Sequence, residues 1–188
     1  MGMTIAEKII AAAAGVDSVK PGDIHTVTLD RMMSNDGTTH LTVDMYNNKL
    51  KILVLQIRRN WYSLWIIMCH QDSPKTAASQ KKMRDFAKEN GIDFWEGKGV
   101  CHQVMMENYV RPGELIFGAD SHTCSYGALG AFGTGVGCTD FLYGMVTGQS
   151  LGTRSRIREI QSDRRTSGRC LCKRSDPDNY RSGWCERM

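Results

Sequence analysis

No uninterrupted apolar segment long enough to cross a bilayer occurs in this 188-residue chain. The most apolar window, ILVLQIRRNWYSLWIIMCHQ at residues 52–71, is interrupted by Arg58 and Arg59 and is too short and too polar to span a membrane. The amino terminus, MGMTIAEKIIAAAAG, has no basic region before its apolar run and no cleavage-site pattern after it, so we predict no secretory signal.

A regular cysteine spacing is also missing, because the seven cysteines are odd in number and unevenly placed. We therefore predict no disulfide framework and a reducing compartment. Together with the lack of a membrane segment, this pattern leads us to expect a cytoplasmic protein.

An excess of one charge is missing from most of the chain. Residues 1–149 carry 14 lysines and arginines against 15 acidic residues, whereas residues 150–188 carry 10 against 5, so the formal net charge of +4 arises in the tail. Such a tail could bind nucleic acid or an anionic surface. Tyr180 and Trp184 alone do not make a stacking platform for bases.

Helix and strand signals alternate along the rest of the chain, whose length suits one good-sized domain. A capping box of Thr4 and Glu7 predicts a helix that ends at Gly15, and Ser73 before a proline predicts a second helix that ends at Gly91. A third helix is predicted over TDFLYGMVTG, residues 139–148.

Strands are predicted over DIHTVTLD at residues 23–30, IDFWEG at 92–97 and ELIFGA at 114–119. SNDGTT at 34–39 is predicted as a turn, followed by a short helix through Tyr46. Alternating strands and helices indicate an α/β domain with its loops gathered at the strand ends.

Polar side chains follow two of these strands. His102 lies in GKGVCHQV, and Asp120, Ser121 and His122 lie in GADSHT. In an open α/β sheet these positions face one crevice, where a histidine and an aspartate form an oriented acid–base pair. A hydrogen-bonded structural histidine, or an Asp-Ser turn that caps a helix, explains the same pattern equally well.

Several other motifs carry weaker signals. Ser121 lacks the G-x-S-x-G elbow of a nucleophile, and the glycines of residues 127–137 allow close backbone approach without the G-x-G-x-x-G register of a dinucleotide site. Asn35, within SNDGTT, offers an amide to an anionic substrate or belongs to an ordinary turn. The CLC sequence at 170–172 is poorly spaced for zinc.

Taken together, the motifs GMTIAEKI, KPGDI, MSNDGTT, GKGVCHQV and PGELIFGADSHTCSYGALGAFGTGVGCTD resemble the aconitase superfamily. Within it they are most similar to the branch of 3-isopropylmalate dehydratase large subunits and homoaconitase-like relatives. The resemblance covers residues 1–51 and 72–149. It implies a partial three-layer α/β/α domain of the aconitase type and a hydro-lyase that removes and re-adds water on a 2-hydroxy acid in leucine biosynthesis.

The resemblance also implies roles for individual residues. His102 and Asp120 look like one His–Asp pair of the family, and His122 looks like a second imidazole whose carboxylate partner lies further along the family sequence. Ser121 and Asn35 look like substrate contacts. These assignments name His102, Asp120 and His122 as catalytic, and Asn35 and Ser121 as substrate-binding.

The family's cofactor is a 4Fe–4S cluster, in which one iron is not held by cysteine and acts as a Lewis acid. The resemblance places its three cysteine ligands downstream of this chain, so we expect no metal ligand here. The resemblance implies no cluster ligand in the amino-terminal part of the family sequence, which is where this chain has Cys101, Cys124 and Cys138. A separate small subunit completes the site in this branch, and we expect no membrane or nucleic-acid partner.

Two stretches depart from the family, residues 52–71 and the basic tail, 150–188. Residues 52–70 can be written with permitted codons and then read in another frame, in which the last base of each codon joins the first two bases of the next codon. This reading gives PCIADPEKLVFIMDHNVP, which contains the family's strand and its Asp-His dipeptide. For residues 162–188 we use the third frame, in which the last two bases of each codon join the first base of the next codon. This reading gives LTGELPDGVYAKDLILTIIGLDGANG, which resembles the family's next segment.

We therefore hypothesise a frame-disrupted family member, with a compensated shift across 52–71 and an uncompensated one near residue 149. The domain would then be residues 1–149, and 150–188 an aberrant, disordered tail, with little activity in the isolated chain. The alternatives are a working homoaconitase-like or 2,3-dimethylmalate dehydratase-like large subunit, and a non-catalytic remnant or tail-driven nucleic-acid binder.

Overall fold

The computed structural model describes residues 3–20, 22–49, 63–67 and 73–153. The chain divides into two compact units, Met1–Ser155 and Arg156–Met188, and the second lies outside the described residues. Predictions that concern residues 52–62, 68–71 and 154–188 also lie outside the described residues.

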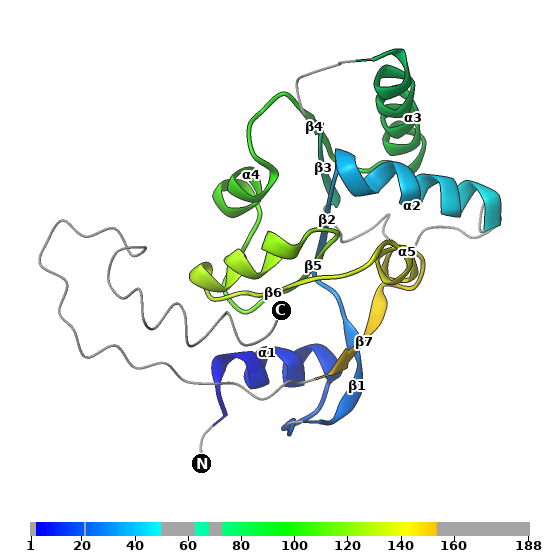
Figure 1. Ribbon diagram of the computed structural model, residues 1–188. Coiled ribbons are helices and arrows are strands. Elements are labelled where there is room, and N and C mark those ends of the chain that lie inside the picture. Colours follow the sequence, from blue (N-terminus) through cyan, green and yellow to red (C-terminus); the bar gives the residue numbers. More distant parts are fainter. Residues whose placement is uncertain (1–2, 21, 50–62, 68–72, 154–188) are drawn as a thin grey trace, which may run out of the picture. The chain divides into compact units, whose positions relative to one another are not determined.

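The described residues of the first unit form two sheets. The larger has five parallel strands in the order β4-β3-β2-β5-β6 (Figure 1). Its strands are β2 (Arg31–Asn35), β3 (Ser63–Ile67), β4 (Phe94–Glu96), β5 (Leu115–Gly118) and β6 (Phe132–Gly135). The smaller sheet is an antiparallel pair of β1 (Ile24–Thr28) and β7 (Gln149–Thr153).

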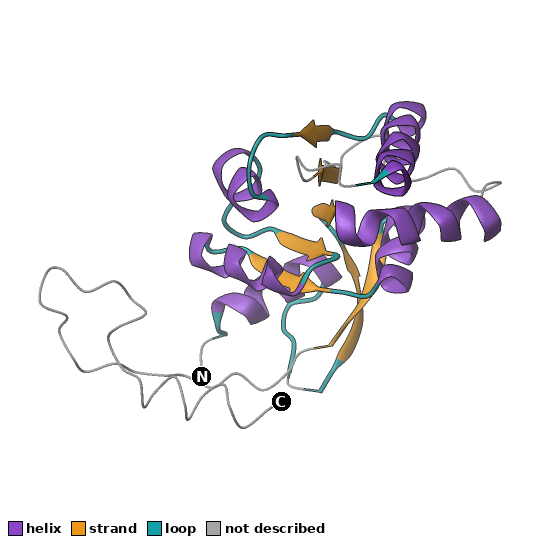
Figure 2. Ribbon diagram, turned by 45° about the horizontal axis from the view of Figure 1, so that its top comes forward, coloured by secondary structure: helices purple, strands orange, loops and turns teal. Residues whose placement is uncertain are grey.

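Helices lie on both faces of the larger sheet (Figure 2). They are α1 (Ile5–Ala14), α2 (Asp36–Lys49), α3 (Pro74–Asn90), α4 (Cys101–Asn108) and α5 (Cys138–Thr147), together with the 3-10 helix η2 (Ser121–Leu129). Among the helices that the structure describes, none has the length and apolar character needed to cross a membrane.

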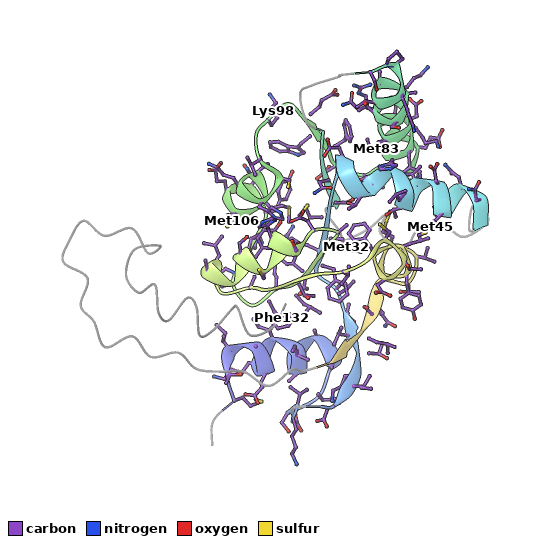
Figure 3. The ribbon with its side chains drawn as sticks, in the orientation of Figure 1. Met32, Met45, Met83, Lys98, Met106 and Phe132 are labelled. Carbon is purple, nitrogen blue, oxygen red and sulfur yellow. The ribbon has the colours of Figure 1, made fainter. Side chains whose placement is uncertain are left out.

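The core divides into two clusters because successive strand residues face opposite sides of the sheet. Met32 and Phe117 belong to the larger cluster, which contains residues of α1, α2, α3 and α5. Met33 and Ile116 belong to the smaller cluster, with residues of α4 and η2. Figure 3 shows the separation, with Met32 toward α2 and α5 and Met106 on α4. This three-layer arrangement confirms the α/β fold class.

The two predicted capped helices are confirmed. Thr4 and Glu7 form a reciprocal capping box at α1, and the Ser73 hydroxyl accepts from the backbone N–H of Thr76 at α3. Gly15 and Gly91 end these helices in the left-handed conformation, which glycine adopts without a steric penalty.

The turn predicted at residues 34–39 is wrong. Ser34 and Asn35 end β2, and α2 begins directly at Asp36 and continues to Lys49. Pairing of β2 with β3 and β5 on both sides outweighs the turn preference of the short polar residues.

Four further elements differ from the sequence analysis. Strand β3 forms within the segment 52–71 that showed no strand periodicity, because backbone pairing with both β2 and β4 does not require alternation. Helix α4 and strand β6 were not predicted. Strand β7 continues past the boundary predicted at residue 149 and pairs with β1 through residue 153.

Candidate active site

The candidate site lies at the carboxyl edge of the larger sheet. Parallel strands end at the same edge, so the residues that follow them meet there. Asn35 is the last residue of β2, His102 is the second residue of α4 after β4, and Asp120 follows β5 as the N-cap of η2. Ser121 and His122 are the first residues of η2.

Asp120 is the centre of a hydrogen-bond network. Its Oδ1 lies 2.8 Å from Nε2 of His102, 2.8 Å from the backbone nitrogen of His122 and 3.0 Å from Nδ1 of the His122 ring. Its Oδ2 accepts from Nδ2 of Asn35 at 3.3 Å. The two imidazole rings lie 5.8 Å apart between centroids. The structure thus brings His102, Asp120, His122 and Asn35 into one cluster.

The network keeps the Asp120 carboxyl ionised. Burial of this carboxyl favours its neutral form, but hydrogen bonds from the His122 backbone and from both imidazoles outweigh burial and lower the pKa of Asp120. An ionised carboxylate can only accept hydrogen bonds, so the ring nitrogens of His102 and His122 that face it must carry protons.

The two histidines differ in exposure. The His102 side chain is 13% exposed and that of His122 is 80% exposed. With its Nδ1 held by Asp120, His122 presents Nε2 without a hydrogen bond to any residue that the structure describes. His122 is therefore the imidazole of the pair that can meet a ligand directly. The resemblance had implied a different carboxylate partner for His122, one further along the chain.

Asn35 and Ser121 take different places in the site. Asn35 Oδ1 accepts from the backbone N–H of Thr38 at 3.3 Å and from its hydroxyl at 3.1 Å, which fixes the amide plane and leaves Nδ2 toward Asp120. Ser121 is exposed beside His122. Asn35 thus orients the carboxylate, and Ser121 is free to face a ligand.

Tyr126 is the residue that the sequence analysis missed. Its side chain is fully buried in the smaller cluster, and its hydroxyl lies 3.0 Å from Nδ1 of His102. Burial, with smaller electrostatic contributions from Cys101 and Asp120, raises the pKa of Tyr126 far above its ordinary value. The one signal in the sequence was a tyrosine within an otherwise small-residue stretch, and periodicity does not detect it.

Glycines allow η2 to lie close against β5 and β6. A Cβ atom added to Gly135 would lie 2.7 Å from the carbonyl oxygen of Asp120 and 3.1 Å from Cα of Ser121. Added Cβ atoms at Gly118 and Gly133 would overlap Thr123. The predicted close backbone approach therefore serves packing that positions Asp120 and Ser121.

Potential metal ligands are limited in the described ranges to one cluster. His102, Asp120 and His122 offer ligand atoms within 4.8 Å of one another. These atoms already hydrogen bond to each other, and the hydrogen bonds alone account for their arrangement.

The cysteines of the described residues do not fit an iron–sulfur cluster. Cys124 and Cys138 point their thiols toward different carbonyls, those of Ser121 and Thr38, and no group of three thiols forms in the described part of the chain. Burial raises the pKa of the Cys101 thiol, which disfavours the thiolate that a metal requires.

Comparison with known proteins identifies the family. The sequence pattern of the aconitase family (aconitate hydratase) matches residues 8–166. The chain is 43% identical over 157 residues to the 3-isopropylmalate dehydratase large subunit of Sulfurihydrogenibium sp. (strain YO3AOP1), and 46% identical over 156 residues to large subunit 1 of this enzyme from Pyrococcus furiosus.

These alignments cover 80% and 79% of this chain, respectively, and 36% of each relative. The chain therefore spans about a third of the length of the curated relatives that it matches. Because the family pattern matches most of the chain, this protein belongs to the aconitase family of hydro-lyases.

Proposed function

We propose that this chain is part of a 3-isopropylmalate dehydratase large subunit and holds the acid–base half of its active site. The single observation that supports this most is the shared carboxylate of Asp120, which orients a buried and an exposed imidazole at the sheet edge. The substrate would be a small 2-hydroxy acid. The enzyme would interconvert 2- and 3-isopropylmalate by dehydration and rehydration in leucine biosynthesis.

The proposed chemistry follows from the proton positions. Dehydration takes a proton and a hydroxyl group from adjacent substrate carbons and releases them as water. Asp120 holds the proton of His122 on Nδ1, which leaves the Nε2 lone pair free to carry that proton from the substrate to the leaving hydroxyl, and in the reverse direction during rehydration. The negative charge of Asp120 stabilises the imidazolium that forms. The hydroxyl of Ser121, exposed beside His122, would bind a carboxylate of the substrate.

The remaining parts of the enzyme belong to the proposal as well. The family uses an iron–sulfur cluster, and the thiols of the described residues do not fit one. As the resemblance implies, we propose that its cysteine ligands belong to another part of the enzyme. A separate small subunit would cover the exposed His122 side. We place the enzyme in the cytoplasm and propose no role for nucleic acid.

Ligand titration of the full chain tests the proposed site. Histidines labelled with 15N report on ring nitrogens, and His122→Gln and His102→Gln variants assign the signals. On addition of 2-isopropylmalate we expect a saturable shift of the His122 signals, with little change at His25 on β1. Ser121→Ala should weaken this response.

Isopropylsuccinate provides the matched control ligand, since it keeps both carboxylates and lacks the hydroxyl group. At equal ionic strength it should bind more weakly than 2-isopropylmalate. Absence of any saturable shift at His122 with 2-isopropylmalate would contradict the proposed site.

A further inference from the structure

The contact between Tyr126 and His102 goes beyond the proposed acid–base pair. Tyr126 packs between α4 and the sheet in the smaller core cluster and is 0% exposed. Its ring centroid lies 5.7 Å from that of His102 at an interplanar angle of 52°, and its hydroxyl meets Nδ1 of the imidazole. The phenol thus extends the network from Asp120 into the core.

Proton positions decide the direction of this hydrogen bond. Asp120 is an ionised acceptor, so Nε2 of His102 carries the proton that it donates at 2.8 Å. A neutral imidazole with a proton on Nε2 has a lone pair on Nδ1. The Tyr126 hydroxyl keeps its proton because burial strongly disfavours the phenolate. For the neutral imidazole, the hydroxyl is therefore the donor at 3.0 Å.

We propose that Tyr126 is a positioning residue, whose hydroxyl donates to Nδ1 of His102 and holds the ring with Nε2–H directed at Asp120. Both nitrogens of His102 are then engaged, so His102 orients Asp120 and does not itself exchange protons with a ligand. The open position of the network is Nε2 of His122. Tyr126 acts at one end of a chain of hydrogen bonds, and His122 lies at the other.

Packing alone would not require this hydroxyl. Phenylalanine has nearly the volume of tyrosine and would fill the same place in the smaller cluster, which also contains Met105 and Ala131. Tyr126→Phe therefore removes the donor and keeps the ring. Tyr143→Phe is the matched control, because Tyr143 is 53% exposed on α5.

The test is 15N NMR of the histidine rings in the full chain, with His102 assigned by His102→Gln. The wild-type protein should show His102 protonated on Nε2, with its Nδ1 signal at the position of a hydrogen-bonded, unprotonated nitrogen. Tyr126→Phe should move the Nδ1 signal to that of an unbonded nitrogen and should also change the His122 ring signals through Asp120. Tyr143→Phe should change neither.

Two results would overturn the proposal. The first is a proton on Nδ1 of His102 in the wild-type protein, which requires no variant and stays decisive if Tyr126→Phe fails to fold. The second is an unchanged Nδ1 signal in a Tyr126→Phe protein that keeps the wild-type near-UV circular dichroism. Neither measurement uses activity, so the result is independent of whether the hydro-lyase proposal holds.

Discussion

The Asp120 carboxylate accepts hydrogen bonds from His102, His122 and Asn35, so its negative charge contributes to the stability of the folded state. The folded state lowers the pKa of Asp120, so the charged form stabilises the fold above the ordinary carboxyl pKa of about 4, and this contribution is lost as pH falls through the lower folded value. The pH window of the effect therefore lies below about pH 4.

Replacement of Asp120 by asparagine tests this charge. We expect Asp120→Asn to lower the free energy of unfolding by about 1–3 kcal/mol near pH 7. The amide removes the charge that strengthens the three hydrogen bonds to Oδ1, and its NH2 group would face the Asn35 amide donor where Oδ2 now accepts. Urea unfolding from about pH 7 to about pH 3 measures it, and the difference from wild type should narrow below about pH 4.

The control for this series is Asp17→Asn, at an exposed position in the turn after α1. It should stay within about 0.5 kcal/mol of the wild-type protein throughout. A difference between Asp120→Asn and wild type that stays constant at low pH would show that the charge of Asp120 does not stabilise the fold.

The residues of the site were partly predictable. His102 and Asp120 each follow a strand, and the geometry of parallel sheets predicted their juxtaposition. Tyr126 could not be predicted in this way, since its contact with His102 depends on how η2 packs under α4. The shared use of Asp120 by His122 likewise depends on the N-cap geometry of η2.

Among the elements, the close packing of η2 against the sheet depends on glycines in β6. Gly135→Ala should destabilise the protein by about 1–3 kcal/mol, because the new methyl group would press on the backbone of Asp120 and Ser121. The same variant should move the ring signals of His122. Chemical denaturation and histidine NMR measure the two effects.

Gly127→Ala is the matched control within η2, since a Cβ there meets no atom within 4 Å and the residue has no positive φ. Its effect should stay within about 0.5 kcal/mol. Equal stability of the two variants would contradict the role assigned to the close approach of β6.

Strands β2 and β5 are joined at the end opposite the site by an ion pair. Arg31 and Glu114 form two hydrogen bonds at 2.8 and 2.9 Å, with side chains 9% and 17% exposed. Glu114→Gln should cost about 3–5 kcal/mol, because the buried guanidinium loses its partner charge. The His102 and His122 signals should remain unchanged if the protein stays folded.

Glu96→Gln offers a close comparison, since Glu96 makes the same two-bonded contact with Arg84 on the surface. Exposed pairs contribute about 0–1 kcal/mol, so this variant should be nearly neutral. Similar losses for Glu114→Gln and Glu96→Gln in thermal and urea unfolding would refute the distinction.

Sequence patterns identified the elements that local chemistry specifies. Helices α1 and α3 were predicted with their ends, because Thr4, Ser73, Gly15 and Gly91 satisfy the terminal backbone groups locally. Strands β2, β3 and β6 were not predicted, and the end of β2 was assigned to a turn, because neighbouring strands supply their hydrogen bonds.

At the scale of the whole molecule, residues 52–71 are the internal stretch that the motifs resembling the family do not cover. We propose that a compensated frame shift produced them and that a second shift near residue 149 produced the basic tail. The nucleotide sequence of the gene tests the proposed frame shifts. In the region that encodes residues 52–71, another reading frame should encode an Asp-His dipeptide. Close relatives that carry these residues in frame would contradict the proposal.

An iron and sulfide determination tests our proposal most directly. We propose that this chain holds the acid–base half of a dehydratase site and not the metal-binding half. The full chain is incubated anaerobically with iron, sulfide and reductant, then desalted and analysed. We predict far less than one iron per chain and no cluster absorbance. About four irons and four sulfides per chain, with a stable cluster spectrum, would contradict it.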